Sequence, residues 1–204
     1  MNEVADIIIQ QWQQQSVFEL LAVVFSVTYV WLAAEESVWC WPAALISTTL
    51  YTFVFFDVSL IFQMLLNLYY MLMAVIGFYH WKINETEDFN ALVMPLKLHI
   101  LFIGAGLIMT YLLASNANRW FAYELLTLDA AITVFSLLTT YLTVKKYLQS
   151  WVYWTLINIA SIYLFWSAGL YLTVLLMCLY ITIAIRGYIN WSKDLKISTQ
   201  VEHG

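Results

Sequence analysis

Seven apolar runs, each long enough to cross a bilayer as a helix, constrain this chain more than any other feature of its sequence. They cover 17–34, 38–56, 58–81, 96–115, 122–144, 149–167 and 169–191. A membrane-spanning helix needs about 20 mainly apolar residues. Only 10% of the 204 residues are charged, against roughly 25% in a soluble domain. We therefore expect an all-α membrane protein with seven transmembrane helices.

Charge placement predicts how these helices face the membrane. If the N-terminus lies outside, seven of the eight basic residues fall on the inner side: Lys82, Lys97, Lys145, Lys146, Arg186, Lys193 and Lys196. Only Arg119 then falls on the outer side. Because loops rich in Lys and Arg stay in the cytoplasm, we expect an outside N-terminus and a cytoplasmic C-terminus.

A repeat lies within the apolar sequence. At one constant offset in residue number, Glu19 pairs with Asp129, Phe25 with Phe135, Ser26 with Ser136, Trp41 with Trp151, Phe55 with Phe165, Tyr70 with Tyr180, Gly77 with Gly187, and Trp81 with Trp191. In so hydrophobic a chain, matched acids, glycines and tryptophans are more specific than matched aliphatic residues. The sequence therefore predicts two copies of a three-helix unit.

Three helices are an odd number, so a further helix is needed to bring the second copy into the direction of the first. We expect a 3+1+3 arrangement within a single transmembrane domain over 1–204. The first triple-helix bundle covers 17–81, the linker helix 96–115 and the second bundle 122–191. Two parallel bundles of this kind occur in SWEET-like transporters, and transporters built from repeats hold substrate near the midplane between them.

The sequence lacks the motifs of several function classes. Neither a Walker loop nor an H-E-x-x-H or C-x-x-C motif is present. His80, His99 and His203 are scattered, while Cys40 and Cys178 lie in apolar runs, where cysteine is a small packing residue. We therefore expect no enzyme activity, no metal, no cofactor and no nucleic-acid partner.

Two acidic residues, Glu19 and Asp129, lie at equivalent positions near the predicted outer ends of their apolar runs. A charge at the membrane centre costs roughly 2.5–3.5 kcal/mol, so such residues usually face the bundle interior. Asp129 is therefore a candidate substrate-binding residue. The alternative is that both acids lie in the outer interface, where this cost is small.

The sixth apolar run offers the richest candidate site, in the segment W-V-Y-W-T-L-I-N at 151–158. Trp151, Trp154 and Asn158 are three and four residues apart, so they share one helix face. Two indoles and an amide suit a flat cationic ring, because each cation–π contact contributes about 0.5–2 kcal/mol. Trp151 also fits an aromatic belt at the membrane surface, since two lysines precede it closely.

Asn67 is a second amide in the middle of an apolar run, and it joins the candidate site. The alternative is a bond from helix to helix, which contributes about 0.6 kcal/mol on average. Tyr171 and Tyr188 are the tyrosine candidates, although tyrosines of membrane helices more often belong to the aromatic belt.

Several motifs together resemble the PnuC family of nicotinamide riboside transporters. In the second half they are W-x-x-W-x-x-x-N at 151–158, G-L-Y-L-T at 169–173 and A-I-R-G-Y-I-N-W at 184–191. The first half agrees at I-G-F-Y-H-W, 76–81. Family members carry a glutamine at the position of Asn67, and some carry an asparagine at that of Arg186.

The resemblance implies uptake of nicotinamide riboside across the bacterial cytoplasmic (inner) membrane by facilitated diffusion, with a cytoplasmic kinase trapping the vitamin. Trp151, Trp154 and Asn158 would then contact the substrate. Thiamine, carried by related transporters, is the alternative substrate, because it is also a planar cationic ring with a hydroxyl-bearing arm. A non-transporting membrane scaffold or receptor is the remaining alternative. The resemblance is also compatible with a homotrimer.

Overall fold

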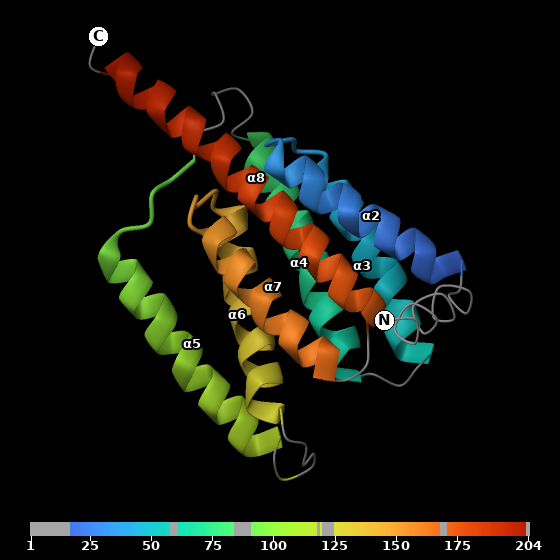
Figure 1. Ribbon diagram of the computed structural model, residues 1–204. Helices are drawn as coiled ribbons and strands as arrows, with labels where there is room; N and C mark the ends of the chain where they lie inside the picture. Colours follow the sequence, from blue (N-terminus) through green and yellow to red (C-terminus); the bar gives the residue numbers. More distant parts are fainter. Residues whose placement is uncertain are drawn as a thin grey trace, which may run out of the picture.

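The computed structural model describes residues 17–57, 61–83, 91–117, 119, 125–167 and 171–202. This part of the chain forms seven α-helices (Figure 1), which are α2 (Val17–Ala34), α3 (Cys40–Asp57), α4 (Ile61–Ile83), α5 (Leu96–Ala117), α6 (Leu126–Val144), α7 (Ser150–Ser167) and α8 (Tyr171–Glu202). The all-helical fold expected from the apolar runs is confirmed.

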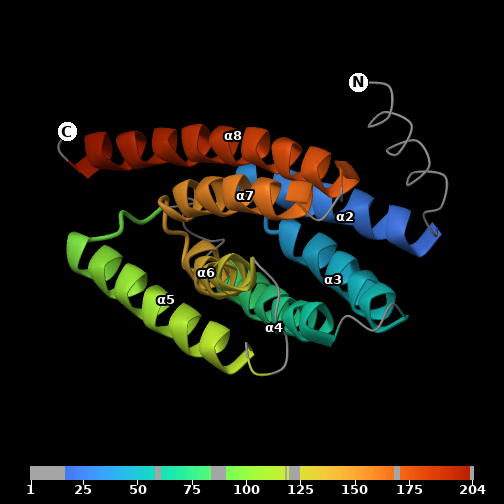
Figure 2. The same cartoon turned by 60° about the horizontal axis from the view of Figure 1, so that its bottom comes forward.

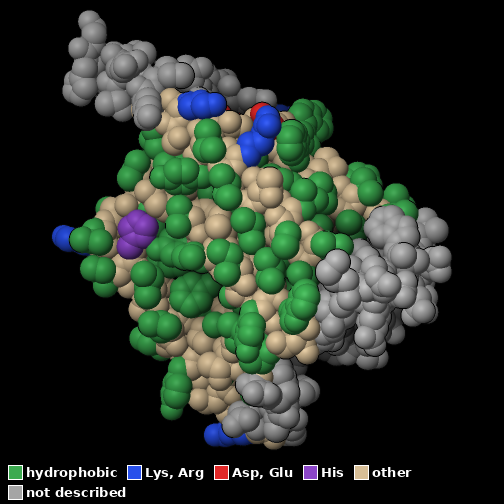
Figure 3. Space-filling view, viewed as in Figure 1, with side chains coloured by type: hydrophobic (Ala, Val, Ile, Leu, Met, Phe, Trp, Pro, Cys, Tyr) green, Lys and Arg blue, Asp and Glu red, His purple; other side chains and the backbone are tan. Residues whose placement is uncertain are grey.

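The surface of these helices is suited to lipid. Four stretches of the described residues are long and apolar enough to cross a bilayer: Met64–Ile83, Leu96–Ala117, Leu126–Val144 and Val174–Lys193. Large apolar side chains are exposed on all seven described helices. Figure 3 shows hydrophobic side chains spread over one face, with Lys and Arg at its edges. In water so large an exposed apolar surface would drive aggregation, whereas in a bilayer it meets lipid chains.

Polar residues interrupt the apolar sequences of α3 and α7. The interruptions include Ser47 and Thr48 in α3, and Asn158 and Ser161 in α7. All four side chains are buried. The residues that lower the hydropathy of α3 and α7 therefore face protein.

Six of the helices close a ring. α2 packs on α3 and α3 on α4, while α6 packs on α7 and α7 on α8. Contacts of α4 with α6 and of α8 with α2 join these two series into a closed circuit. α5 lies at the edge of the ring against α6 (Figures 1 and 2). The ring therefore has two junctions between the first and the second half of the chain.

The turns after α2 and α6 have the same backbone structure. Glu36 and Lys146, which are related by the offset of the sequence repeat, both adopt the left-handed conformation, with φ of 62° and 60°. The amide of Glu36 bonds to the carbonyl three residues earlier and that of Ser37 to the carbonyl five residues earlier, and Lys146 and Tyr147 repeat this pattern. These are the paired bonds of a Schellman cap. The sequence offset thus recurs in local structure that no hydropathy plot reports.

Four tryptophans from both halves of the chain meet in one cluster. Trp41 and Trp151 stand edge-on to Trp81 and Trp191, with ring centroids 5.3 and 5.4 Å apart. Trp81 and Trp191 are themselves 5.8 Å apart. All four indoles are at most 3% exposed, and edge-to-face aromatic pairs add about 0.5–1.5 kcal/mol beyond the area they bury. The cluster joins the two halves near the last turns of α2, α4 and α6.

Glycines make room for this cluster. A Cβ atom on Gly77 would lie 2.5 Å from the Trp41 indole, and one on Gly187 would lie 2.6 Å from the Trp151 indole. No side chain larger than hydrogen fits in so small a space. The paired glycines and tryptophans of the repeat therefore form two equivalent helix contacts, α3 with α4 and α7 with α8.

Two indole N–H groups bond across the halves. Trp81 donates to the carbonyl of Val144 at 3.0 Å, and Trp191 donates to the carbonyl of Ala33 at 3.1 Å. Both carbonyls lie in the last turn of a helix, where intrahelical partners run out, and that of Ala33 also accepts from the Glu36 amide. Each half of the chain thereby caps a helix of the other half.

The helices begin and end close to the predicted limits, with one large exception. α8 continues to Glu202, whereas its apolar run ends at 191. Residues 192–202 contain neither Gly nor Pro, so nothing stops the helix where the apolar residues end.

Candidate functional site

Buried polar side chains mark the interior of the ring. In a membrane protein such side chains face protein, because lipid cannot bond them. On α3, α4, α6 and α7 the buried polar set comprises Ser47, Thr48, Asn67, Ser136, Thr139, Thr140, Thr143, Ser150, Asn158 and Ser161, each at most 9% exposed. This set is the starting point for a functional site.

Several of these hydroxyls are bonded within their own helices. Thr48, Thr140, Thr143 and Ser161 each donate to the carbonyl four residues earlier, at 2.8–3.1 Å. Such bonds let a hydroxyl lie in an apolar setting at low cost. These four hydroxyls therefore need no acceptor on another helix.

Asn158 is the polar residue with the most unused capacity. Its side chain is 6% exposed, and its amide forms no hydrogen bond with any described residue. The equivalent residue of the first half is Thr48, whose hydroxyl donates to the carbonyl of Ala44 in its own helix. Asn158 therefore presents two donors and an acceptor at mid-helix that the described helices do not use.

Trp154 lies one turn from Asn158 on α7 and is held in place. Its indole Nε1 donates to Oγ1 of Thr143 on α6, at 3.0 Å. The ring is partly buried and packs against the core cluster. Because the N–H is occupied, what the indole offers a ligand is its aromatic face.

Asn67 lies across the ring on α4 and is 7% exposed. One turn further along, Tyr70 approaches the hydroxyls of Ser136 and Thr140 on α6. The equivalent pair at the other junction, Ser26 of α2 and Tyr180 of α8, forms a hydrogen bond. Both junctions thus bring a tyrosine of one half to a serine of the other.

Trp151 and Tyr188 are placed differently. Trp151 fills the space over Gly187 and stands edge-on to Trp191, so its indole is a packing element. Tyr188 is 40% exposed. Both residues border a shallow groove of about 210 Å³ on the outside of α7 and α8. The structure therefore does not bring Tyr188 together with Asn158.

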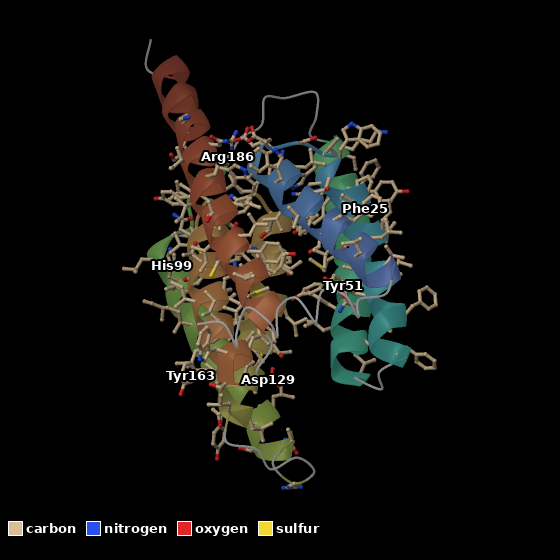
Figure 4. The ribbon with its side chains drawn as sticks, turned by 45° about the vertical axis from the view of Figure 1, so that its right-hand side comes forward. Phe25, Tyr51, His99, Asp129, Tyr163 and Arg186 are labelled. Atoms are coloured by element: carbon tan, nitrogen blue, oxygen red, sulfur yellow. The ribbon has the colours of Figure 1, made fainter. Side chains whose placement is uncertain are left out.

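Asp129 lies far from the tryptophan cluster, in the first turn of α6. Figure 4 shows it toward the end of the molecule opposite Arg186. There the positive end of the helix dipole stabilises its negative charge. The side chain also interacts with another residue. The side chains of Glu19 and Tyr171 lie outside the described part of the structure.

The interior polar set is neutral. Among the described residues, the buried cation is Lys146, which lies in the turn between α6 and α7 with its Nζ 5.5 Å from the centre of the Trp81 ring. No three His, Cys, Asp or Glu side chains gather as metal ligands in the described part of the chain. Neutral amides, hydroxyls and aromatic rings are therefore what the interior offers a ligand.

The hydroxyls of α6 were not among the predicted site residues. Ser136, Thr139, Thr140 and Thr143 are spaced so that they lie along one side of the helix, and all are at most 5% exposed. Thr139 Oγ1 has no hydrogen-bond partner among the described residues. Their helical spacing was readable in the sequence, since a polar stripe in an apolar run indicates a face that avoids lipid.

Known proteins resemble this chain over most of its length. The model of a family described as nicotinamide mononucleotide transporter matches residues 16–193. A nicotinamide riboside transporter PnuC from Neisseria mucosa is 30% identical over 170 residues, covering 74% of this chain and 63% of that relative. The chain thus spans less than two thirds of that relative's length.

Two further likenesses cover more of each protein. A nicotinamide riboside transporter PnuC from Escherichia coli is 22% identical over 200 residues, covering 85% of this chain and 84% of the relative. A solved structure, that of the vitamin B3 transporter PnuC, matches with a TM-score of 0.75 at 23% identity, over 95% of this chain and 90% of that chain. At this identity the structural match shows a shared fold.

Proposed function

Since this chain belongs to the nicotinamide mononucleotide transporter family, we propose that it carries nicotinamide riboside across the bacterial cytoplasmic membrane by facilitated diffusion. The family resemblance inferred from its motifs is confirmed. Two relatives bear the name of nicotinamide riboside transporters. The pathway runs through the interior of the ring, along the buried polar set.

The neutral interior is the reason for proposing the riboside, and not the mononucleotide, as the substrate. A mononucleotide brings a phosphate, and proteins bind phosphates with Arg, Lys or helix N-termini. The buried polar residues of the described helices are amides and hydroxyls, with no cation among them. The riboside has a cationic pyridinium ring, neutral hydroxyls and a carboxamide, which suit these groups.

Trp154, Asn158 and Asn67 are the proposed contacts. The face of the Trp154 indole lies against the pyridinium, since its N–H is bonded to Thr143. The Asn158 amide pairs with the carboxamide and in doing so gains bonds that the described helices do not give it. The buried amide of Asn67 and the Thr139 hydroxyl lie within the same polar interior and meet the ribosyl hydroxyls.

Two parallel three-helix bundles joined by α5, with the N-terminus outside, complete the proposal. Cross-half contacts at both ring junctions, together with the matching turns at Glu36 and Lys146, support this arrangement. Rocking of one bundle against the other would expose the site to each side in turn. Phosphorylation of the riboside by a cytoplasmic kinase then traps it, so that net uptake needs no energy-coupling domain.

Uptake into proteoliposomes tests the proposal. Purified protein should exchange labelled nicotinamide riboside, and unlabelled nicotinamide mononucleotide should not compete. Asn158→Leu, which keeps the branched side-chain shape without the amide, should weaken uptake about tenfold, in line with the loss of a buried hydrogen bond. Asn116→Leu is the matched control, because Asn116 lies exposed on α5.

The other outcomes each remove one claim. Equal competition by the mononucleotide would contradict the argument from the neutral interior. Stronger competition by thiamine would make thiamine the substrate. A chain that exchanges no vitamin above empty liposomes would be a scaffold or receptor. Normal uptake by Asn158→Leu would remove Asn158 from the site while leaving the transport function intact.

A further inference from the structure

A groove of about 580 Å³ lies between α2 and α8, on the outside of the ring. It is lined by Trp31, Leu179, Thr182, Ile183, Ile185, Arg186, Ile189, Asn190 and Lys193. Its walls are mainly apolar, and Leu179, Ile185 and Ile189 are 43–50% exposed. The basic residues lie at one end, where α2 terminates. The groove is thus apolar along its length and cationic at its end.

Arg186 is fixed at this end by two contacts. Its Nε and Nη2 both lie within 2.7 Å of Oε1 of Glu35, and its guanidinium carbon lies 4.4 Å from the centre of the Trp31 ring. The first contact joins α8 to the turn directly after α2, and the second joins α8 to α2. The guanidinium carries five N–H donors, and its side chain is still half-exposed. It therefore keeps donors that are oriented and not yet used.

Lys193 supplies the excess charge. It lies two turns beyond Arg186 on α8, is exposed, and forms no ion pair with a described residue. Since Glu35 neutralises one of the two cations, the end of the groove retains a net positive charge. A fixed guanidinium with an exposed ammonium beside it suits a phosphate group. The guanidinium donates directed hydrogen bonds to the phosphate oxygens, and the ammonium attracts the phosphate as a point charge.

The other junction of the ring lacks this pair of cations, and Lys145 there takes the place of Glu35. At the offset of the sequence repeat, Ile76 takes the place of Arg186 and Ile83 that of Lys193. Both isoleucines are exposed. The basic groove is therefore a property of the α2–α8 junction and not of the repeat, so the duplicated fold does not explain its presence.

We propose that this groove binds one anionic phospholipid, with its phosphate at Arg186 and Lys193 and an acyl chain along the apolar wall. Basic pockets between transmembrane helices bind anionic lipid headgroups. The apolar wall favours a lipid over a free phosphate, because apolar side chains can contact an acyl chain but cannot bind a phosphate. A bound lipid contacts α2 and α8 together and thereby stabilises one junction between the halves. The proposal is independent of the substrate proposed above.

Native mass spectrometry of the full chain in detergent tests this inference by titration with dioleoylphosphatidylglycerol. Lys193→Gln should weaken binding of the first lipid about fivefold, the effect of one basic residue near an anionic headgroup. Lys97→Gln is the matched control, because Lys97 is an exposed lysine at the start of α5, outside the groove. Dioleoylphosphatidylcholine should bind more weakly than the anionic lipid.

Three results would overturn it. Equal affinity for the two lipids would show that charge does not select the ligand. Equal loss in Lys193→Gln and Lys97→Gln would show a diffuse attraction to the whole basic face. Displacement of the lipid by glycerol phosphate would show a site for the phosphate alone. An unchanged thermal midpoint of lipid-free Lys193→Gln, whose side chain is exposed, establishes that the variant folds.

Discussion

Replacing Gly77 by alanine tests whether the tryptophan cluster holds α3 against α4. The new Cβ would lie 2.5 Å from Cε2 of Trp41 and 2.6 Å from two further atoms of the same indole. Trp41 is 1% exposed and stands edge-on to Trp81, so the indole has no free space in which to move. The helices themselves must separate to admit the methyl group.

The magnitude follows from two opposing terms. Overpacking of a tight core costs about 1–3 kcal/mol, and contact with three atoms of a rigid ring belongs at the upper end of that range. Alanine recovers about 1 kcal/mol of helix propensity relative to glycine. The net loss is about 2 kcal/mol, which lowers the melting temperature of a chain of this size by about 4–8 °C.

Thermal unfolding of the purified protein in detergent measures this loss. Gly187→Ala should lower the melting temperature by a similar amount, because its Cβ would meet Trp151 in the same way. Gly104→Ala is the matched control, since its Cβ would have no neighbour within 4 Å. Its melting temperature should stay the same or rise. A Gly77→Ala protein as stable as wild type, or a Gly104→Ala protein that falls equally, would refute the packing argument.

Further predictions concern other contacts between the halves. Trp191→Phe removes the indole donor to the Ala33 carbonyl of α2 and should lower the melting temperature by about 2–4 °C, the effect of one buried hydrogen bond. No change would mean that the Glu36 amide, which also bonds to this carbonyl, satisfies it alone. Glu35→Gln should lower it by at most about 4 °C, because a partly exposed ion pair with Arg186 contributes about 0–1 kcal/mol, and the difference should shrink in high salt. Burial lowers the pKa of Lys146 from its usual 10.5, with partial compensation by the Glu36 carboxylate. Between the lowered pKa and 10.5 the unfolded chain therefore binds more protons, so stability should rise with pH in that window. Lys146→Met should flatten this rise in a thermal series; a rise that persists would assign it to another group.

Much of the candidate site was readable in the sequence. A polar residue in an apolar run must avoid lipid, so Asn67 and Asn158 were expected in the interior, and both are buried. Trp151 and Trp154 were harder to tell apart. They lie on one face of α7, yet one packs on a glycine of α8 and the other bonds to a threonine of α6. Spacing along one helix does not reveal which neighbour a side chain meets.

The sequence alone determined seven helices and a repeat. The helices follow from apolar residues close together in the chain, and the repeat follows from matching residues at one constant offset. Only the tertiary structure decided how several of the helices are rotated. Helices α3, α5 and α7 are apolar nearly all round, so no amphipathic stripe sets their rotation. That rotation depends on partners on other helices: Gly187 for Trp151, Thr143 for Trp154, and Glu35 for Arg186. The closed ring decides these pairings, and with them which polar groups can meet a ligand.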